Sequence, residues 1–182
     1  MDKKVLVPIA QGTEEMEAII VIDLLRRSGI SVKVASEGEI TTCSRGIKII
    51  ADTLLDKIST DERFDAIVLP GGAEGTENLL NNSHLEDLLK SQKEKEGLIA
   101  AICAAPTILA THNLLNPETV ITSHPSVKNQ LTQYKYLEEK VVFSGNFLTS
   151  RGAGTAIDFA LALIEILVSV EKAKEISMAI MY

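Results

Sequence analysis

Cysteine 103 occupies a position where a thiol could act as a nucleophile. It ends the apolar run "LIAAI" and precedes "AAPTILA", in which a proline opens a helical pattern. A cysteine at a strand-to-helix junction resembles a nucleophile elbow, and the helix N-terminus favours a thiolate. The small Ala104 beside it leaves room for a substrate. The alternative is a buried structural cysteine, which is common in apolar strands, and position alone does not separate the two.

Glu17 is the first candidate partner of this thiol. It lies in "GTEEMEAI" and leads into apolar residues, so it is predicted to face the sheet edge, whereas Glu14 and Glu15 suit the exposed first turn. A carboxyl group with a raised pKa could donate a hydrogen bond to a thiolate. Taken alone, Glu17 is better explained as a solvated glutamate at the start of a helix.

Two more segments carry groups of the same kind. Gly71 and Gly72 in "LPGG" free the backbone to present N–H groups, as an oxyanion hole requires, although the motif also makes an ordinary tight turn. His124 in "TSHP" could serve in acid–base chemistry. The sequence has no dinucleotide-binding glycine motif, phosphate loop or metal-ligand spacing, so the predicted chemistry is thiol-based, without cofactor or metal.

The elements that must position these residues alternate between strands and helices. This pattern predicts a single domain over residues 1–182, an α/β fold with a mainly parallel central sheet covered on both faces. In such sheets ligands bind beyond the carboxyl ends of the strands, which is where all four candidates fall. The predicted strands are 3–10, 30–36, 64–72, 98–102 and 119–123, with two short strands within 141–150 and a hairpin-like excursion over 39–55. The predicted helices are 13–29, capped by Thr13, 74–97, split near Asn82, 105–113, 154–168 and 170–181.

Composition restricts the partners and the compartment. The net charge of −7 argues against general binding to nucleic acid or anionic membrane surfaces. No segment reads as a signal peptide, and the most apolar stretch, "AIDFALALIEILVSV", is too short and too acidic to span a bilayer. Two cysteines far apart in sequence form no disulfide framework, so we expect a reducing, cytoplasmic compartment.

Taken together, the motifs resemble the ThiJ/PfpI superfamily, and most closely its deglycase branch. The resemblance covers nearly the whole chain. Its segments are "GTEEMEAI", "DLLRRSGISVKVAS", "CSRG", "VLPGG", "GLIAAICAAPTILA", "TSHP" and "LTSRGAGTAIDFALALIE". The resemblance implies a flavodoxin-like three-layer sandwich and a homodimer. "VEKAKEISMAIM" is similar to the extra C-terminal helix of the deglycase branch.

The resemblance also assigns roles to residues. Cys103 matches the family's reactive cysteine, Glu17 its carboxylic acid partner and His124 the nearby histidine. Gly71 and Gly72 match the glycine turn whose backbone donors face the pocket, and Ala104 is expected with them at the oxyanion and substrate-binding site. Arg27 and Arg45 match arginines near the site and the dimer interface, and Cys43 matches a second cysteine there. Two residues depart from family patterns: Ala104 replaces the histidine of the protease-like branch, and Ala153 replaces a proline common in the deglycase branch.

These roles imply a cofactor-independent enzyme that acts on methylglyoxal, glyoxal and early glycation adducts of proteins or nucleotides, as a glutathione-independent glyoxalase or deglycase in carbonyl and oxidative stress. A redox sensor or redox-regulated chaperone would use the same oxidisable cysteine, and the sequence does not separate these readings. A small-peptide or ester hydrolase is disfavoured by Ala104.

Overall fold

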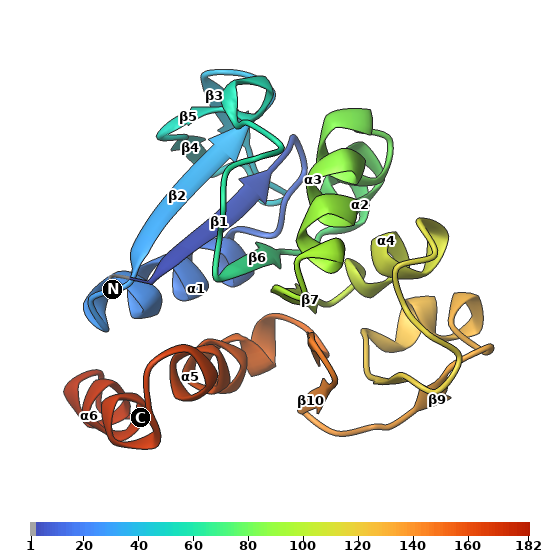
Figure 1. The fold of residues 1–182 in the computed structure, drawn as a ribbon. Helices are drawn as coiled ribbons and strands as arrows, with labels where there is room; N and C mark the ends of the chain where they lie inside the picture. The colour runs from blue at the N-terminus through green and yellow to red at the C-terminus, as the bar shows by residue number, and fades with distance from the viewer. Residues whose placement is uncertain (1–2) are drawn as a thin grey trace.

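The computed structural model describes residues 3–182 and has a seven-stranded central sheet at its centre (Figure 1). The strand order across this sheet is β10-β11-β7-β6-β1-β2-β5. All neighbouring pairs are parallel except β10 and β11. This confirms the mainly parallel sheet expected from the sequence. The strands are β1 (Lys4–Ile9), β2 (Ser31–Ser36), β5 (Thr53–Leu54), β6 (Ala66–Leu69), β7 (Leu98–Ile102), β10 (Val141–Ser144) and β11 (Phe147–Ser150).

Helices cover both faces of the sheet, so its strands are apolar on both sides. Along β1, Val5, Val7 and Ile9 pack with α1 and α5, whereas Leu6 packs with the opposite layer, which contains α2, α3 and α4. The last helix, α6, lies against α5. The helices are α1 (Glu15–Arg27), α2 (Ala73–Leu80), α3 (Ser83–Glu94), α4 (Pro106–Thr111), α5 (Ala156–Leu167) and α6 (Val170–Ala179).

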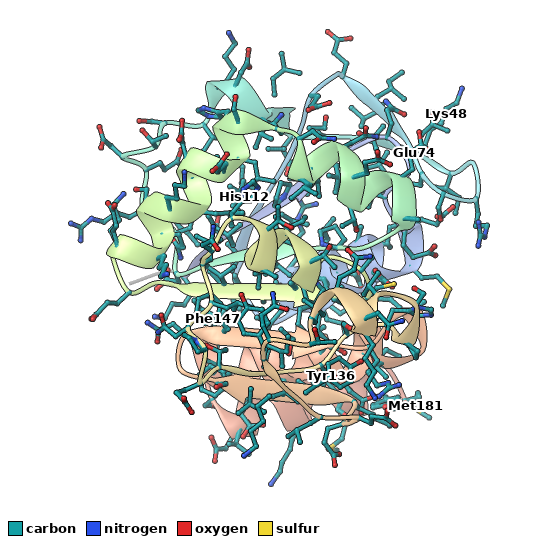
Figure 2. All side chains as sticks on the ribbon, turned by 90° about the vertical axis from the view of Figure 1, so that its right-hand side faces the viewer. Lys48, Glu74, His112, Tyr136, Phe147 and Met181 are labelled. Atoms are coloured by element: carbon teal, nitrogen blue, oxygen red, sulfur yellow. The ribbon has the colours of Figure 1, made fainter. Side chains whose placement is uncertain are left out.

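Side chains fill the space between these layers (Figure 2). His112, just after α4, lies in this filled region, and its Nδ1 is 3.4 Å from a carboxylate oxygen of Glu86 on α3. Met181 lies at the periphery and is exposed. Within residues 3–182, no helix is both long enough and apolar enough to cross a membrane.

Two small pairs of strands lie outside the central sheet. The excursion predicted over 39–55 contains an antiparallel hairpin, β3 (Ile40–Thr42) with β4 (Lys48–Ile50), before β5 joins the main sheet. The second pair is parallel and joins β8 (Val120–Ile121) to β9 (Lys135–Tyr136). The described residues also contain three short 3-10 helices, Leu55–Lys57, Pro125–Gln130 and Ala153–Thr155.

The start of α1 differs from the prediction in two ways. Thr13 does not cap the helix: its hydroxyl accepts a hydrogen bond from the Ala10 amide at 3.0 Å, and α1 begins at Glu15. Glu15 is not exposed. Its carboxylate is buried against the β3–β4 connection, where it accepts hydrogen bonds from the Ser44 hydroxyl and the Arg45 amide. These contacts come from residues 29 and 30 positions away, so the local pattern could not reveal them.

Candidate active site

Cys103 lies in a strained turn directly after β7. Its φ is 65°, which is the left-handed region that residues with a side chain rarely adopt. Two backbone hydrogen bonds hold it there: its amide donates to the Ser150 carbonyl at 3.0 Å, and its carbonyl accepts from the His124 amide at 2.8 Å. The turn therefore holds the side chain at the sheet edge, as the elbow hypothesis requires.

Glu17 reaches this edge from α1 and is fully buried. Its Oε2 accepts a hydrogen bond from the Gly71 amide at 2.8 Å, while the buried Oε1 has no hydrogen-bond partner among residues 3–182. Burial raises the pKa of Glu17 to about 7, although the bonds from Gly71 and Cys103 oppose the shift. Near neutral pH the carboxyl group can therefore hold or release a proton.

Cys103 and Glu17 form a coupled pair. Burial and the negative charge of Glu17 raise the pKa of the Cys103 thiol to about 12, against the amides of Gly72 and Ala104, which lower it. The helix N-terminus alone thus does not produce a low thiol pKa, because burial and the carboxylate outweigh it. Once Glu17 carries the proton, its repulsion disappears. Near neutral pH the pair has lost one of its two protons and carries one negative charge. When the remaining proton is on Glu17, this charge is on the sulfur, and Cys103 is a thiolate.

The glycine turn lies directly against both groups. A methyl group on Gly71 would lie 2.6 Å from Cβ of Cys103 and 2.8 Å from Oε2 of Glu17. Gly72 has a φ of 92°, and a methyl group there would collide with the Gly12 carbonyl oxygen. Only glycine allows the backbone to come this close, and the Gly72 amide consequently faces the sulfur.

His124 lines the same cavity as the thiol and is exposed. Its Nδ1 lies 2.8 Å from the Ser126 hydroxyl and accepts a hydrogen bond from the Ser126 amide at 3.2 Å. With Nδ1 acting as an acceptor, the neutral ring carries its proton on Nε2. His124 is therefore arranged as a hydrogen-bond donor more than as a base.

These residues open into one cavity of about 660 Å³. Arg45 lines it and is held in place through its amide, which donates to Glu15 at 2.9 Å. A small dicarbonyl fills only a fraction of this volume. Besides Glu17, Cys103 and His124, the cavity is lined by residues that include Glu14, Gly72, Ala73, Thr76, Glu77, Leu80, Ala104, Thr107, Ser126, Val127, Gln130 and Ala153.

Two residues assigned by resemblance lie away from the cavity of this chain. Arg27 is at the opposite end of α1, where it pairs with Asp23 at 2.6 Å. Cys43 is buried, and burial together with Glu15 and Glu14 raises the pKa of its thiol to about 11. Both cysteines are free. Among residues 3–182, no cluster of His, Cys, Asp or Glu could hold a metal ion.

Sequence reasoning missed three contributors to the site: Glu15, Ser126 and Gly152. A methyl group on Gly152 would lie 3.9 Å from Sγ of Cys103. The glycine-rich "RGAG" segment at a strand end was a signal that could have identified Gly152. No local sequence pattern identifies Glu15 or Ser126 as site residues, because their contacts depend on where other segments pack.

Known proteins share the sequence pattern and the fold of this chain. Residues 3–166 match the model of the DJ-1/PfpI family. Protein dj-1beta of Drosophila melanogaster is 49% identical over 181 residues, which cover 97% of this chain and 96% of the relative. Its crystal structure matches with a TM-score of 0.96, covering 100% of this chain and 98% of that chain.

Two further relatives carry functional descriptions. Glutathione-independent glyoxalase DJR-1.2 of Caenorhabditis elegans is 39% identical over 165 residues, which cover 89% of this chain and 87% of the relative. The structure of Toxoplasma gondii DJ-1, described as oxidized, is 41% identical, with a TM-score of 0.93 and coverage of 99% of this chain and 98% of that chain.

Proposed function

Because the chain belongs to the DJ-1/PfpI family, we propose that it is a cofactor-independent thiol enzyme that converts methylglyoxal and glyoxal to hydroxy acids and acts on early glycation adducts. The observation that carries the proposal is the Cys103 thiol beside a buried carboxyl group whose pKa lies near neutrality. The glyoxalase among the relatives supports the same substrate class.

The reaction begins with addition of the Cys103 sulfur to the aldehyde carbon. A carbon–sulfur bond forms, the carbonyl becomes an alkoxide, and this oxygen takes up the proton held by the Cys103–Glu17 pair. The Gly72 amide and Nε2–H of His124 are the donors available to stabilise the developing negative charge. The product of this step is a hemithioacetal on Cys103.

Glu17, now ionised, moves the remaining proton. It removes the hydrogen from the former aldehyde carbon, the hydroxyl proton passes from the first oxygen to the neighbouring carbonyl oxygen, and Glu17 returns its proton to the neighbouring carbon. These transfers convert the hemithioacetal into a thioester with a hydroxyl group on the neighbouring carbon. Water then cleaves the thioester, releasing lactate from methylglyoxal or glycolate from glyoxal and regenerating the thiol. The sequence of steps adds one water and needs neither oxidant nor reductant.

The test is formation of lactate from methylglyoxal without glutathione. We expect Cys103→Ser and Glu17→Gln to reduce the rate at least about a hundredfold, which is the lower range for losing a general acid–base group. Cys43→Ser is the matched control and keeps full activity. Glu17→Gln retaining wild-type turnover would contradict the proton-transfer role and leave His124 as the candidate for it.

Action on adducts is tested separately, because adducts also release free dicarbonyl. The loss of a preformed methylglyoxal adduct of N-acetylcysteine is compared with its spontaneous release rate. We expect the enzyme to exceed that rate. Adduct loss that never exceeds it would restrict the activity to the free dicarbonyl.

A second candidate function is redox sensing through the same thiol. Cys103 is partly exposed, and a relative of this chain has been described in oxidized form. Cys43 is buried beside Glu15, whose carboxyl pKa is lowered. Glu15 therefore stays ionised, and its negative charge continues to disfavour a thiolate on Cys43. Mild peroxide should therefore add oxygen mainly to Cys103, measured by peptide mass analysis. Oxidation mainly at Cys43 would remove this candidate.

We also propose that the protein forms a homodimer and works in a reducing, cytoplasmic compartment. Supporting the dimer, a groove runs between α1 and the β3–β4 hairpin and includes Ile19, Ile47 and Ile50, which are 43%, 49% and 77% exposed. Charged residues also line it: Asp23, Arg26, Lys48 and Asp52. Exposed isoleucines that are bordered by charges of both signs favour a second copy as the occupant. The two free cysteines favour the reducing compartment.

A further inference from the structure

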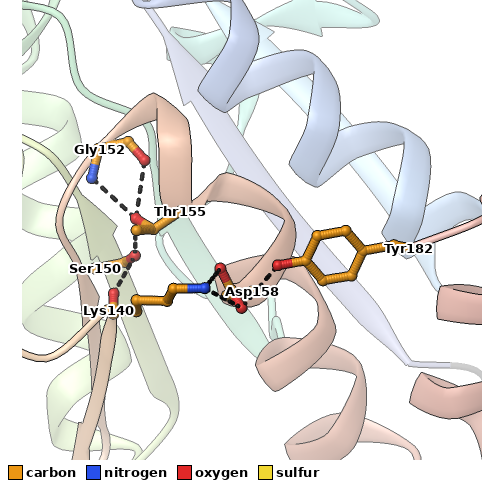
Figure 3. A network of polar contacts seen from close by, with 6 residues as sticks. All are labelled: Lys140, Ser150, Gly152, Thr155, Asp158 and Tyr182. Atoms are coloured by element: carbon orange, nitrogen blue, oxygen red, sulfur yellow. Dashed lines mark hydrogen bonds and ion pairs between the residues drawn. The ribbon is translucent and has the colours of Figure 1, made fainter.

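Two hydroxyl groups lie behind the loop that faces the thiol. Ser150 ends β11 and is fully buried, and Thr155 precedes α5. Their hydroxyl oxygens are 2.7 Å apart, and Oγ of Ser150 is also 2.7 Å from the Lys140 carbonyl (Figure 3). Oγ1 of Thr155 accepts a hydrogen bond from the Gly152 amide at 3.1 Å and lies 2.9 Å from the Gly152 carbonyl. The pair thus closes the loop 150–155 onto itself.

The closed loop lies close to every chemical group of the site. The Ser150 carbonyl receives the Cys103 amide at 3.0 Å. A methyl group on Gly152 would lie 3.5 Å from Cδ2 of His124, 3.8 Å from Oε1 of Glu17 and 3.9 Å from Sγ of Cys103. A shift of this loop by a fraction of an ångström would therefore change the surroundings of all three side chains.

The hydrogen bonds of the pair can be satisfied in two ways. In one, Ser150 donates to the Lys140 carbonyl and Thr155 donates to Ser150. In the other, Ser150 donates to Thr155, and Thr155 donates to the Gly152 carbonyl. In both arrangements the Gly152 amide donates to Thr155. Loss of the Thr155 hydroxyl leaves that buried amide without its partner, which a buried donor tolerates poorly.

The remainder of the network is weaker. Nζ of Lys140 is 3.2 Å from a carboxylate oxygen of Asp158, and the Tyr182 hydroxyl donates to the same carboxylate at 3.0 Å (Figure 3). The Lys140 side chain is 66% exposed, and exposed ion pairs contribute little. The part able to fix the loop is therefore the hydroxyl pair, in which Ser150 is buried and Thr155 half-buried.

We propose that Ser150 and Thr155 are positioning residues for the thiol: their paired hydroxyls hold the loop 150–155 against Cys103, Glu17 and His124, and so keep the strained Cys103 turn beside its carboxyl partner. Neither hydroxyl touches the substrate. The proposal rests on the proposed function only in taking Cys103 as the reactive group, and its test uses no dicarbonyl.

The experiment measures how the rate of Cys103 alkylation by iodoacetamide depends on pH. All variants are made in a Cys43→Ser background, so that one thiol reacts. The wild-type sequence should show a rise with its midpoint near pH 7, where the Cys103–Glu17 pair releases its first proton and a thiolate forms with the other proton on Glu17, well below the pKa of about 12 that the thiol has beside an ionised Glu17. For Thr155→Val we expect the midpoint to rise by about one pH unit, toward that of an ordinary thiol, because a more distant Glu17 no longer shares its proton with the thiolate.

Two variants serve as comparisons. Thr155→Ser keeps the hydroxyl and should restore the wild-type midpoint. Thr122→Val makes the same substitution at a fully buried threonine whose hydroxyl has no hydrogen-bond partner among residues 3–182, and should leave the midpoint unchanged. A residue with a purely structural role would lower the unfolding temperature without moving this midpoint.

A wild-type midpoint in folded Thr155→Val would overturn the proposal. If Thr155→Val does not fold, Ser150→Ala provides the same test through the other hydroxyl, with the same expected shift. A protein that forms no lactate but shows the shift would refute the glyoxalase function and still support the positioning role. If lactate forms, kcat should fall in Thr155→Val while KM stays unchanged.

Discussion

At the scale of single residues, the burial of Glu17 links the stability of the fold to pH. Its pKa is about 7 in the folded protein, against an ordinary value of 4.5. The folded chain therefore binds this proton more tightly than the unfolded chain. The resulting stabilisation is complete below pH 4.5, declines as pH rises and is lost above pH 7, in total about 3 kcal/mol.

Glu17→Gln removes the titration while keeping a group of the same size. The variant should match the wild type near pH 4.5 and be more stable by about 3 kcal/mol at pH 8, because no charge is then buried. Urea unfolding from pH 4.5 to 8.5 measures the difference. Glu77→Gln makes the same change on an exposed carboxyl group and should show no such trend. A constant difference between Glu17→Gln and the wild type across this range would contradict the assignment.

The site residues that could be predicted from the sequence are those that follow the end of a predicted strand. Cys103, Glu17 and Gly72 follow predicted strands, and parallel strands bring their carboxyl ends to one edge. The position of Arg27 relative to the site could not be predicted in this way, because ten residues of helix separate it from Glu17 by about 15 Å. Its assignment came from resemblance, and in this chain it lies at the far end of α1. Ser126 could not be found, since its role depends on a 3-10 helix with no periodic apolar pattern.

At the scale of elements, α2 begins directly on the loop that follows β1. A methyl group on Gly75 would lie 2.5 Å from both the amide nitrogen and Cα of Thr13. These are backbone atoms, so they cannot move aside as a flexible side chain would. The contact fixes how the glycine turn approaches Glu17.

Gly75→Ala should therefore destabilise the protein by about 1–3 kcal/mol, the usual range for overpacking, although alanine normally favours a helix. Gly38→Ala is the matched control, because nothing lies within 4 Å of its added methyl group. Urea unfolding of both variants at pH 7 measures the effect. Equal stability of Gly75→Ala and the wild type would show that the loop can yield.

The central elements were predictable because their patterns are local. The buried strands at 3–10, 30–36, 64–72 and 98–102 were found where continuous apolar runs predicted them, and the break near Asn82 separates α2 from α3. The sequence pattern predicts no helix or strand over 125–140, because β9 has only two residues and pairs with β8, which is distant in sequence. The register of the strands likewise depends on packing, which no local pattern encodes.

At the scale of the whole molecule, the exposed groove between α1 and the β3–β4 hairpin predicts a dimer. Sedimentation at micromolar concentration should give twice the chain mass, and Ile50→Asp should shift it toward the monomer, because a charge would be buried in the contact. Phe143→Asp is the control: it changes another exposed apolar residue, on β10 and outside the groove. A monomeric wild type would contradict the dimer.

The site also draws on most of the chain, and this has a consequence for synthesis. Its groups come from α1, from the turn after β6, from the residues after β7 and β8, and from the loop after β11. A nascent chain emerges from its N-terminus, so Cys103 is made well before the loop at 150–155 that holds its amide. Contacts this distant in sequence also form slowly. Until they form, Cys103 is an ordinary solvent-exposed thiol, and its particular reactivity is among the last properties the folding chain acquires.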